Sequence, residues 1–113
     1  MQEEVTIEIY ETARGNCPYV IWENQLSLEN RAKVRARINR IRLGNFGDVK
    51  TIKGTKGIFE IRLHFGAGYR IYYAKKAAKI VIFLCGGKKD SQFKDIKKAQ
   101  DYWKDYRCLD KED

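Results

Sequence analysis

The chain has 113 residues, of which 43% are hydrophobic and 34% charged, with one proline and nine glycines. This composition fits one globular domain over residues 1–113 and excludes collagen-like, low-complexity and disordered chains. Lys and Arg outnumber Asp and Glu by 23 to 15, and the excess is concentrated in residues 31–98. No apolar run approaches the ~20 residues of a membrane span, so we expect no membrane association and no secretory signal.

The three cysteines predict neither a disulfide framework nor a zinc site. Cys17, Cys85 and Cys108 are an odd number and show no CxxC or Cys/His spacing. We therefore expect a reducing, cytoplasmic environment, no metal and no cofactor.

The basic middle of the chain favours a polyanionic partner, and nucleic acid before a membrane surface. A solvated, lysine-rich surface is the alternative interpretation of the same charge.

The first part of the chain predicts one strand and two helices. Residues 5–9 alternate between apolar and polar side chains, as in a half-buried strand. Pro18 can begin a short helix, and Ser27 is a candidate N-cap for a longer one that ends at Gly44. That longer helix has an apolar stripe of Val34, Ile38 and Ile41 and a separate cationic face of Lys33, Arg37 and Arg40.

Consecutive strands follow. Residues 45–48 predict a turn and residues 49–52 a short strand. In residues 58–65 the apolar side, Phe59, Ile61, Leu63 and Phe65, faces the core, and Glu60, Arg62 and His64 lie on the other side. Residues 66–68 predict a hairpin connection to a return strand at 69–74, on which Arg70 and Tyr72 share a face.

The remaining residues predict a turn, a central strand and a last helix. Residues 75–79 form the turn, and residues 80–85 are continuously apolar, as in a strand covered on both faces. The segment 86–89 ends this strand, and Asp90 or Ser91 can cap a helix with a buried stripe of Phe93, Ile96, Ala99 and Trp103. The order of elements predicts an α+β sandwich with a mostly antiparallel sheet of four or five strands.

A cluster of cations on this sheet suggests phosphate chemistry. We expect Arg62, His64, Arg70 and Lys89 on one polar surface, beside the basic segment of Lys50, Lys53 and Lys56. Cations stabilise the charge that builds on phosphate oxygens, and the planar fork of arginine can hold two oxygens at once. The chain has no motif of a metal-dependent nuclease, so cleavage would proceed by proton transfer, for instance through an RNA 2′-hydroxyl.

The candidate proton carriers each have a structural alternative. His64 could act as acid or base, or be an ordinary strand histidine. Glu60 could deprotonate a hydroxyl, or form a same-face ion pair with Arg62. Lys88 lies beside a helix N-terminus, a junction that favours anions, and Tyr69 could stack on a base or simply pack.

The sequence resembles a known family of toxins. The motifs are NRIRLGNFGDVK at 39–50, EIR at 60–62, GAGYRIYY at 66–73 and LCGGKKDSQ at 84–92. Their order and spacing over residues 3–107 resemble the phage-derived, HigB-like addiction-module killer proteins of the RelE/ParE superfamily. The resemblance implies a compact toxin that a cognate antitoxin neutralises, often a HigA-like protein with a helix-turn-helix domain.

The resemblance also implies a choice of targets. RelE-like members cut mRNA in the ribosomal A site without a metal, and ParE-like members poison DNA gyrase. A nucleic-acid-binding protein without toxicity is a third possibility. An acidic or amphipathic antitoxin segment could cover Arg62 and Arg70 or lock the N-terminal helices.

By the same resemblance, Arg70 matches the strand arginine that stabilises the transition state. Arg62 matches a basic position on the preceding strand, and Lys89 one just beyond the last strand. Glu60 stands where RelE has a lysine. Where RelE-like nucleases carry a tyrosine or histidine as acid, this chain has Gln92, Phe93 and Asp95.

Overall fold

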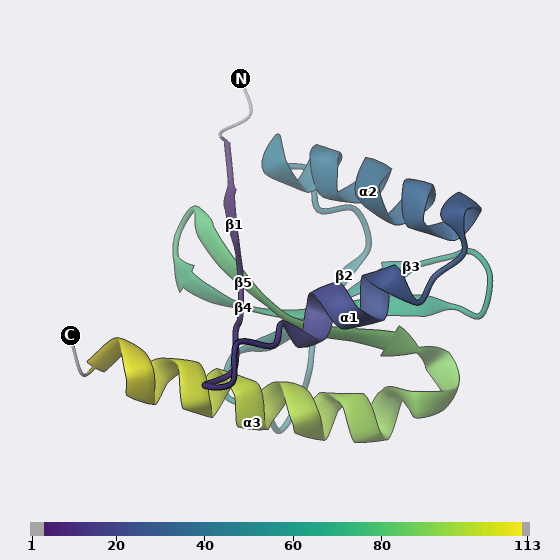
Figure 1. Cartoon of the computed structure of the whole chain (residues 1–113). Coiled ribbons are helices and arrows are strands. Elements are labelled where there is room, and N and C mark those ends of the chain that lie inside the picture. Colours follow the sequence, from purple (N-terminus) through teal and green to yellow (C-terminus); the bar gives the residue numbers. More distant parts are fainter. Residues whose placement is uncertain (1–3, 112–113) are drawn as a thin grey trace.

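The computed structural model describes residues 4–111, with side chains described as far as residue 109. The elements in chain order are β1 (Thr6–Ile9), α1 (Pro18–Asn24), α2 (Leu28–Arg42), β2 (Val49–Thr51), β3 (Ile58–Leu63), β4 (Tyr69–Ala77), β5 (Ile80–Lys88), a short 3-10 helix η1 (Lys89–Ser91) and α3 (Gln92–Lys111). They form one five-stranded sheet with helices on both faces (Figure 1).

The strand order in the sheet is β1-β5-β4-β3-β2. Neighbouring strands β2 to β5 pair antiparallel, and β1 alone pairs parallel, with β5. The predicted α+β fold with a mostly antiparallel sheet is confirmed. Helices α1 and α2 cover one face, and the long helix α3 crosses the other (Figure 1).

Helix α2 begins and packs as its sequence predicts. The hydroxyl of Ser27 accepts a hydrogen bond from the backbone N–H of Asn30, which satisfies one of the donors left open at a helix start. The apolar stripe of Val34, Ile38 and Ile41 is buried against the sheet. Their core partners from the strands are Ile61, Leu63, Ile71, Tyr73, Val81 and Phe83.

Helix α3 differs from the prediction in its first turn. Its face toward the sheet carries Asp95, Ala99 and Tyr102, whereas Phe93 is 91% exposed. Asp95 is buried, and its carboxylate accepts a hydrogen bond from Ser91 in the preceding turn, which replaces a contact with water. Phe93 is therefore a solvent-facing residue, and the predicted buried stripe is wrong at its first position; Ile96 and Trp103 are partly buried.

Two strands are longer than predicted. β4 continues to Ala77, so the turn is shorter than residues 75–79. β5 continues through Gly86 and Gly87 to Lys88, because these glycines still pair with β4. Glycine weakens a strand, but it also allows other groups to approach the backbone closely.

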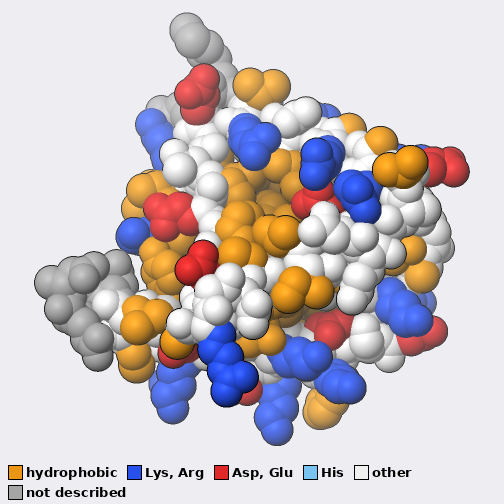
Figure 2. Space-filling model, in the orientation of Figure 1, with side chains coloured by type: hydrophobic (Ala, Val, Ile, Leu, Met, Phe, Trp, Pro, Cys, Tyr) orange, Lys and Arg blue, Asp and Glu red, His pale blue; other side chains and the backbone are white. Residues whose placement is uncertain are grey.

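The view in Figure 2 shows apolar side chains gathered in a hollow between β1, α1 and α2. A cavity of about 460 Å³ lies there, and its apolar lining includes Ile9, Val20, Ile38 and Phe83. No helix in the described part of the chain is both long and apolar enough to cross a membrane.

Candidate functional site

The β3–β4 hairpin brings two arginines together. Arg62 and Arg70 are direct cross-strand partners, so their side chains leave the sheet on the same face. Gly66 and Gly68 in the connecting turn have φ of 56° and 74°, a region that glycine adopts without steric cost. The turn between β3 and β4 lies at the end of the sheet where α3 begins (Figure 1).

The carboxylate of Glu60 anchors this pair. Glu60 is fully buried, and its Oε1 accepts a hydrogen bond from Arg62 Nε at 3.0 Å. Its Oε2 accepts from Gln92 Nε2 at 2.7 Å and lies 3.3 Å from Arg70 Nε, which has no aligned hydrogen bond of its own. The alternative of a Glu60–Arg62 ion pair is confirmed. The carboxylate thus accepts two hydrogen bonds and forms an ion pair with Arg70, an arrangement that holds the two arginines; the role of Glu60 as a proton carrier stays a prediction.

Sequence patterning put Glu60 on a polar face, and the burial is a correction to that prediction. The first turn of α3 covers this side of β3, and Gln92 closes over the carboxylate. A buried carboxylate is tolerated only when charges and hydrogen bonds compensate its lost hydration. Here the two guanidinium groups and the amide supply that compensation.

Both guanidinium groups are partly accessible. The side chains of Arg62 and Arg70 are 31% and 12% exposed. Arg70 Nη1 donates to the carbonyl of Gly68 at 2.9 Å, which fixes the plane of its fork. Arg62 Nε donates to Glu60 and Arg70 Nε lies beside it, so the terminal nitrogens other than Arg70 Nη1 are the donors left for an anion, which a guanidinium group can bind in bidentate fashion.

His64 and Asp48 form a pair on one side of the arginines. His64 Nε2 lies 2.5 Å from Asp48 Oδ2, and the histidine side chain is 71% exposed. The pKa of Asp48 is lowered, first by the hydrogen bond with His64 and then by the charges of His64, Arg62 and Arg37. His64 and Arg62 therefore face the same carboxylate, and Nδ1 of His64 is the ring nitrogen not engaged by Asp48.

Lys89 lies on the other side of the arginine pair. A methyl group on Gly68 would lie 3.5 Å from Lys89 Cβ and 3.7 Å from Arg70 Nη1. Lys89 is exposed, and it begins the η1 turn directly after β5. We refer to Glu60, Arg62, Arg70, Lys89 and the His64–Asp48 pair as the arginine cluster.

Most of the other predicted cationic residues lie outside this cluster. Lys53 and Lys56 precede Ile58, at the opposite end of β3 from Arg62, and Lys56 lines a separate cavity beside α3. This is a correction to the predicted single basic surface, because a strand of six residues separates its two ends by about 20 Å. Lys50 is exposed and is the residue of β2 that lies directly opposite Glu60 of β3 in the backbone register.

Helix α2, which carries the predicted cationic face, packs on the face of the sheet opposite Glu60, but the charge of its Arg37 interacts with Asp48. Lys33 and Arg40 are exposed there. Arg37 is half-buried, donates to the carbonyl of Phe46 and contacts Gly47, so it supports the turn before β2. Burial lowers the pKa of Arg37.

Tyr69 and Lys88 are cross-strand partners near the end of the sheet, and Tyr69 packs on the face that α1 and α2 cover. The ring of Tyr69 packs against Trp22 and Phe65, and its hydroxyl accepts a hydrogen bond from Asn30. Tyr69 is thus a packing residue in this structure. Lys88 is exposed at the end of β5.

Sequence reasoning missed two members of the site. Gln92 was noted only as a departure from the nuclease pattern, although its amide bonds to Glu60. Asp48 was assigned to a turn, and its pairing with His64 depends on β2 lying beside β3. Both residues lie within the motifs of the family resemblance, but their partners, Glu60 and His64, are 32 and 16 residues away in the chain. Local sequence patterns therefore did not indicate these contacts.

Within residues 4–111, no group of three or more His, Cys, Asp or Glu side chains is arranged to hold a metal ion. The chemistry of the arginine cluster is that of an anion-binding surface with an adjacent imidazole.

A family model agrees with the resemblance described above. The model of the phage-derived Gp49-like proteins (DUF891) matches residues 22–104, a range that contains α2, β2 to β5 and every member of the arginine cluster. The chain belongs to this family. It is the family of RelE/ParE-like, HigB-like addiction-module toxins.

A relative from Haemophilus influenzae (strain Rd) is 48% identical over 80 residues. The match covers 70% of this chain and 79% of the relative, which is described as an uncharacterized protein. No solved structure shows significant similarity.

Proposed function

We propose that this Gp49-like protein is the toxin of a toxin–antitoxin module and that it cleaves mRNA on the ribosome, without a metal, at the arginine cluster. The observation that carries the proposal is the pair of guanidinium groups held by one buried carboxylate. Charges fixed before the substrate arrives stabilise a developing charge without having to reorganise. A surface lysine patch would lack this fixed geometry.

The reaction proposed is attack of a 2′-hydroxyl on the neighbouring phosphate. The 2′-oxygen bonds to phosphorus, the bond from phosphorus to the 5′-oxygen breaks, and negative charge builds on the non-bridging oxygens. In this proposal Arg62 and Arg70 hold these oxygens with their terminal nitrogens, and Lys89 adds a third positive charge; the neighbouring positions of the three residues support it. Each such contact contributes about 10²-fold or more to the rate.

His64 is our candidate for the proton transfer. Its Nε2 is oriented by Asp48, which leaves Nδ1 to take the proton of the 2′-hydroxyl. A histidine oriented by a carboxylate is a recurring arrangement in general base catalysis. The proton that the 5′-oxygen takes up comes from a second donor, for which Lys89 is the candidate by position.

Partners follow from the same proposal. The excess of basic residues supports docking on ribosomal RNA, so cleavage should require the ribosome. The family's association with addiction modules supports a protein antitoxin as the second partner.

The test is a transcriptome-wide map of new mRNA 5′ ends after brief induction of the protein. We expect in-frame cuts within translated codons, and we expect Arg70→Ala to reduce them by about 10²-fold or more. Arg14→Ala is the matched control, because Arg14 is an exposed arginine in the turn before α1, outside the basic middle of the chain, and its loss should leave the cuts unchanged.

Two outcomes would contradict the proposal. Growth arrest without new 5′ ends would indicate a toxin that blocks another target, such as gyrase, by binding alone. Rapid cutting of naked mRNA by the purified protein would refute the dependence on the ribosome.

A further inference from the structure

The edge of strand β5 is only half covered. β5 has nine residues, whereas its outer neighbour β1 has four and pairs only with Ile80 to Phe83. The last backbone contact of β1 with β5 is from Tyr10 N–H to the carbonyl of Phe83. The chain then leaves the sheet through a turn at residues 12–16. Among residues 4–111, no strand lies along the outer edge of Leu84–Lys88.

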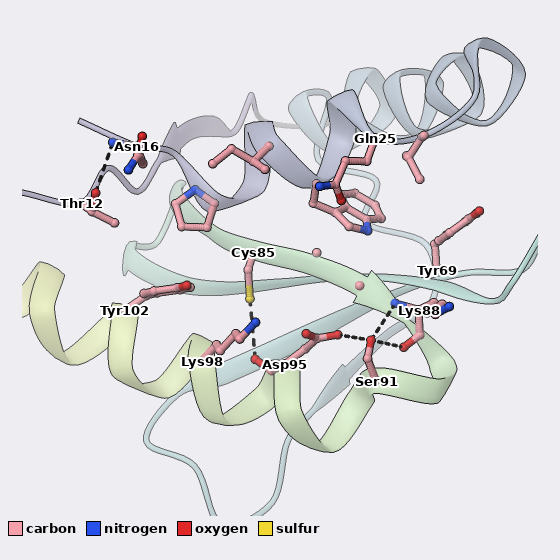
Figure 3. A pocket seen from close by; sticks show the side chains of 16 residues that line it. Thr12, Asn16, Gln25, Tyr69, Cys85, Lys88, Ser91, Asp95, Lys98 and Tyr102 are labelled. Atoms are coloured by element: carbon pink, nitrogen blue, oxygen red, sulfur yellow. Dashed lines mark hydrogen bonds between the residues drawn. The ribbon is translucent and has the colours of Figure 1, made fainter. Parts of the chain in front are cut away.

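A groove runs along this uncovered edge. Its volume is about 730 Å³, and its floor is formed by residues 85–88. Figure 3 shows α1 as one wall and α3 as the other, with Gln25 on the first and Lys98 and Tyr102 on the second. The groove is therefore an open slot in the plane of the sheet, continuing the line of β1.

The floor of the groove is backbone because of two glycines. A Cβ atom on Gly86 would overlap the ring of Trp22 from α1, and one on Gly87 would overlap the carboxylate of Asp95 from α3. Neither position can carry a side chain that would screen the strand edge. Alternate residues of such an edge direct their N–H and C=O groups outward, where they can pair with another extended chain. At Lys88 both groups are already bonded to the hydroxyl of Ser91, so the open part of the edge is Leu84–Gly87.

The exposed charges around the groove are positive. Lys88 and Lys98 line it, and both are exposed. The carboxylate that also lines it, Asp95, is buried and already accepts the hydroxyl of Ser91 at 2.5 Å. An occupant with carboxylates would be complementary to these two lysines.

We propose that the edge of β5 at residues 84–87 binds an extended, acidic segment of a partner polypeptide, which adds to the sheet as a strand between α1 and α3. A peptide is favoured over RNA because the floor presents main-chain groups in the repeat of a β-ladder. The proposal concerns a surface beside the arginine cluster and does not depend on RNA cleavage.

The test uses the full chain and a synthetic peptide that alternates Glu and Val over seven residues. We expect residues 84–87 to gain protection from amide hydrogen exchange, with a dissociation constant at or below about 1 mM. The control peptide has the same side chains but is N-methylated at alternate residues, on the edge that would face β5. Its affinity should be lower by at least about tenfold, because its hydrogen-bond donors on that edge are removed.

A matched pair of variants tests the charge argument. Lys98→Glu should weaken binding of the acidic peptide several-fold, and Lys97→Glu, the same change on an exposed neighbour outside the groove, should not. Both variants should keep the mRNA cleavage of the parent protein, which separates this proposal from the proposed function.

Four results would overturn the proposal. The first is no protection of residues 84–87 at 1 mM peptide, and the second is equal binding of the N-methylated peptide. The third is stronger protection of these amides by a single-stranded RNA oligonucleotide, which would make the groove an RNA channel. The fourth is protection that rises with protein concentration alone, which would assign the edge to a second copy of this chain.

Discussion

Adjacent residues of strand β3 enter two different environments. Ile61 faces α2 and joins a core in which the buried side chains from the strands are apolar or aromatic. Glu60 faces the start of α3 and is equally buried, but among two arginines and a glutamine. Both residues are 0% exposed, so burial alone does not distinguish a core position from a site position.

The difference teaches how this small domain combines stability with a charged site. Apolar burial is non-directional and contributes about 25 cal/mol per Å². A buried ion pair contributes little net stability, since the cost of desolvation offsets the attraction, but it fixes the orientation of its partners. We therefore expect variants on the α2 face to change stability and variants around Glu60 to change activity.

The largest effect should come from the apolar face. Ile61→Ala should lower the free energy of unfolding by about 2–5 kcal/mol, because it leaves a cavity in a fully buried position. Chemical denaturation followed by tryptophan fluorescence measures the change. The folded fraction of this variant should still cleave mRNA. Loss of cleavage by the folded protein would contradict the assignment of stability to the α2 face and activity to the surroundings of Glu60.

Gly87 tests the boundary where α3 meets β5. Gly87→Ala should lower the free energy of unfolding by about 1–3 kcal/mol, since the new methyl group overlaps the Asp95 carboxylate. In an Asp95→Ala background the same substitution should cost less, which a double-mutant cycle measures. Strictly additive costs would show that the contact between these two residues is not what requires glycine.

Glu60→Gln tests the charged side. The substitution keeps the shape but removes the charge that orients Arg62 and Arg70, so we expect cleavage to fall about tenfold, or about 1.4 kcal/mol. A positioning role predicts that the pH profile of the remaining activity keeps its shape. Loss of one limb of that profile would instead identify Glu60 as the proton carrier.

The smallest effect should come from Asp48. In the folded protein the pKa of Asp48 is lower than the ordinary value of 3.8. The ionised carboxylate therefore contributes its full stabilisation above pH 3.8, and this stabilisation is lost as the pH falls through the pKa of the folded state. Asp48→Asn should therefore reduce the loss of stability that the protein shows as pH falls below the ordinary pKa of 3.8, as measured by denaturation at a series of pH values. An unchanged acid profile would show that the His64 contact does not persist in solution.

Local patterns predicted the elements well, and for identifiable reasons. The Ser27 cap, the spacing of Val34, Ile38 and Ile41, and the glycines of the β3–β4 turn are each dictated by neighbours within a few residues. The pairing of Arg62 with Arg70 followed from that hairpin, since a short turn fixes the register. The site prediction was therefore strongest where its members are joined by one turn.

Errors arose where distant segments meet. At the start of α3, Phe93 is exposed and Asp95 is buried, and Gln92 of the same turn covers Glu60. The basic segment around Lys53 and Lys56 was placed beside the arginines, but the length of β3 separates them. Neither result can be derived from periodicity within one element.

By itself, the sequence determined the order of strands and helices, the apolar stripe of α2 and the family to which the chain belongs. Short-range hydrogen bonds and side-chain spacing specify these features. Only the tertiary structure decided that Glu60 is the shared anchor of two arginines, that Asp48 orients His64, and that the edge of β5 stays open past Phe83. Each of these depends on how elements far apart in the chain pack, and the free energies that decide such packing are summed over the whole domain.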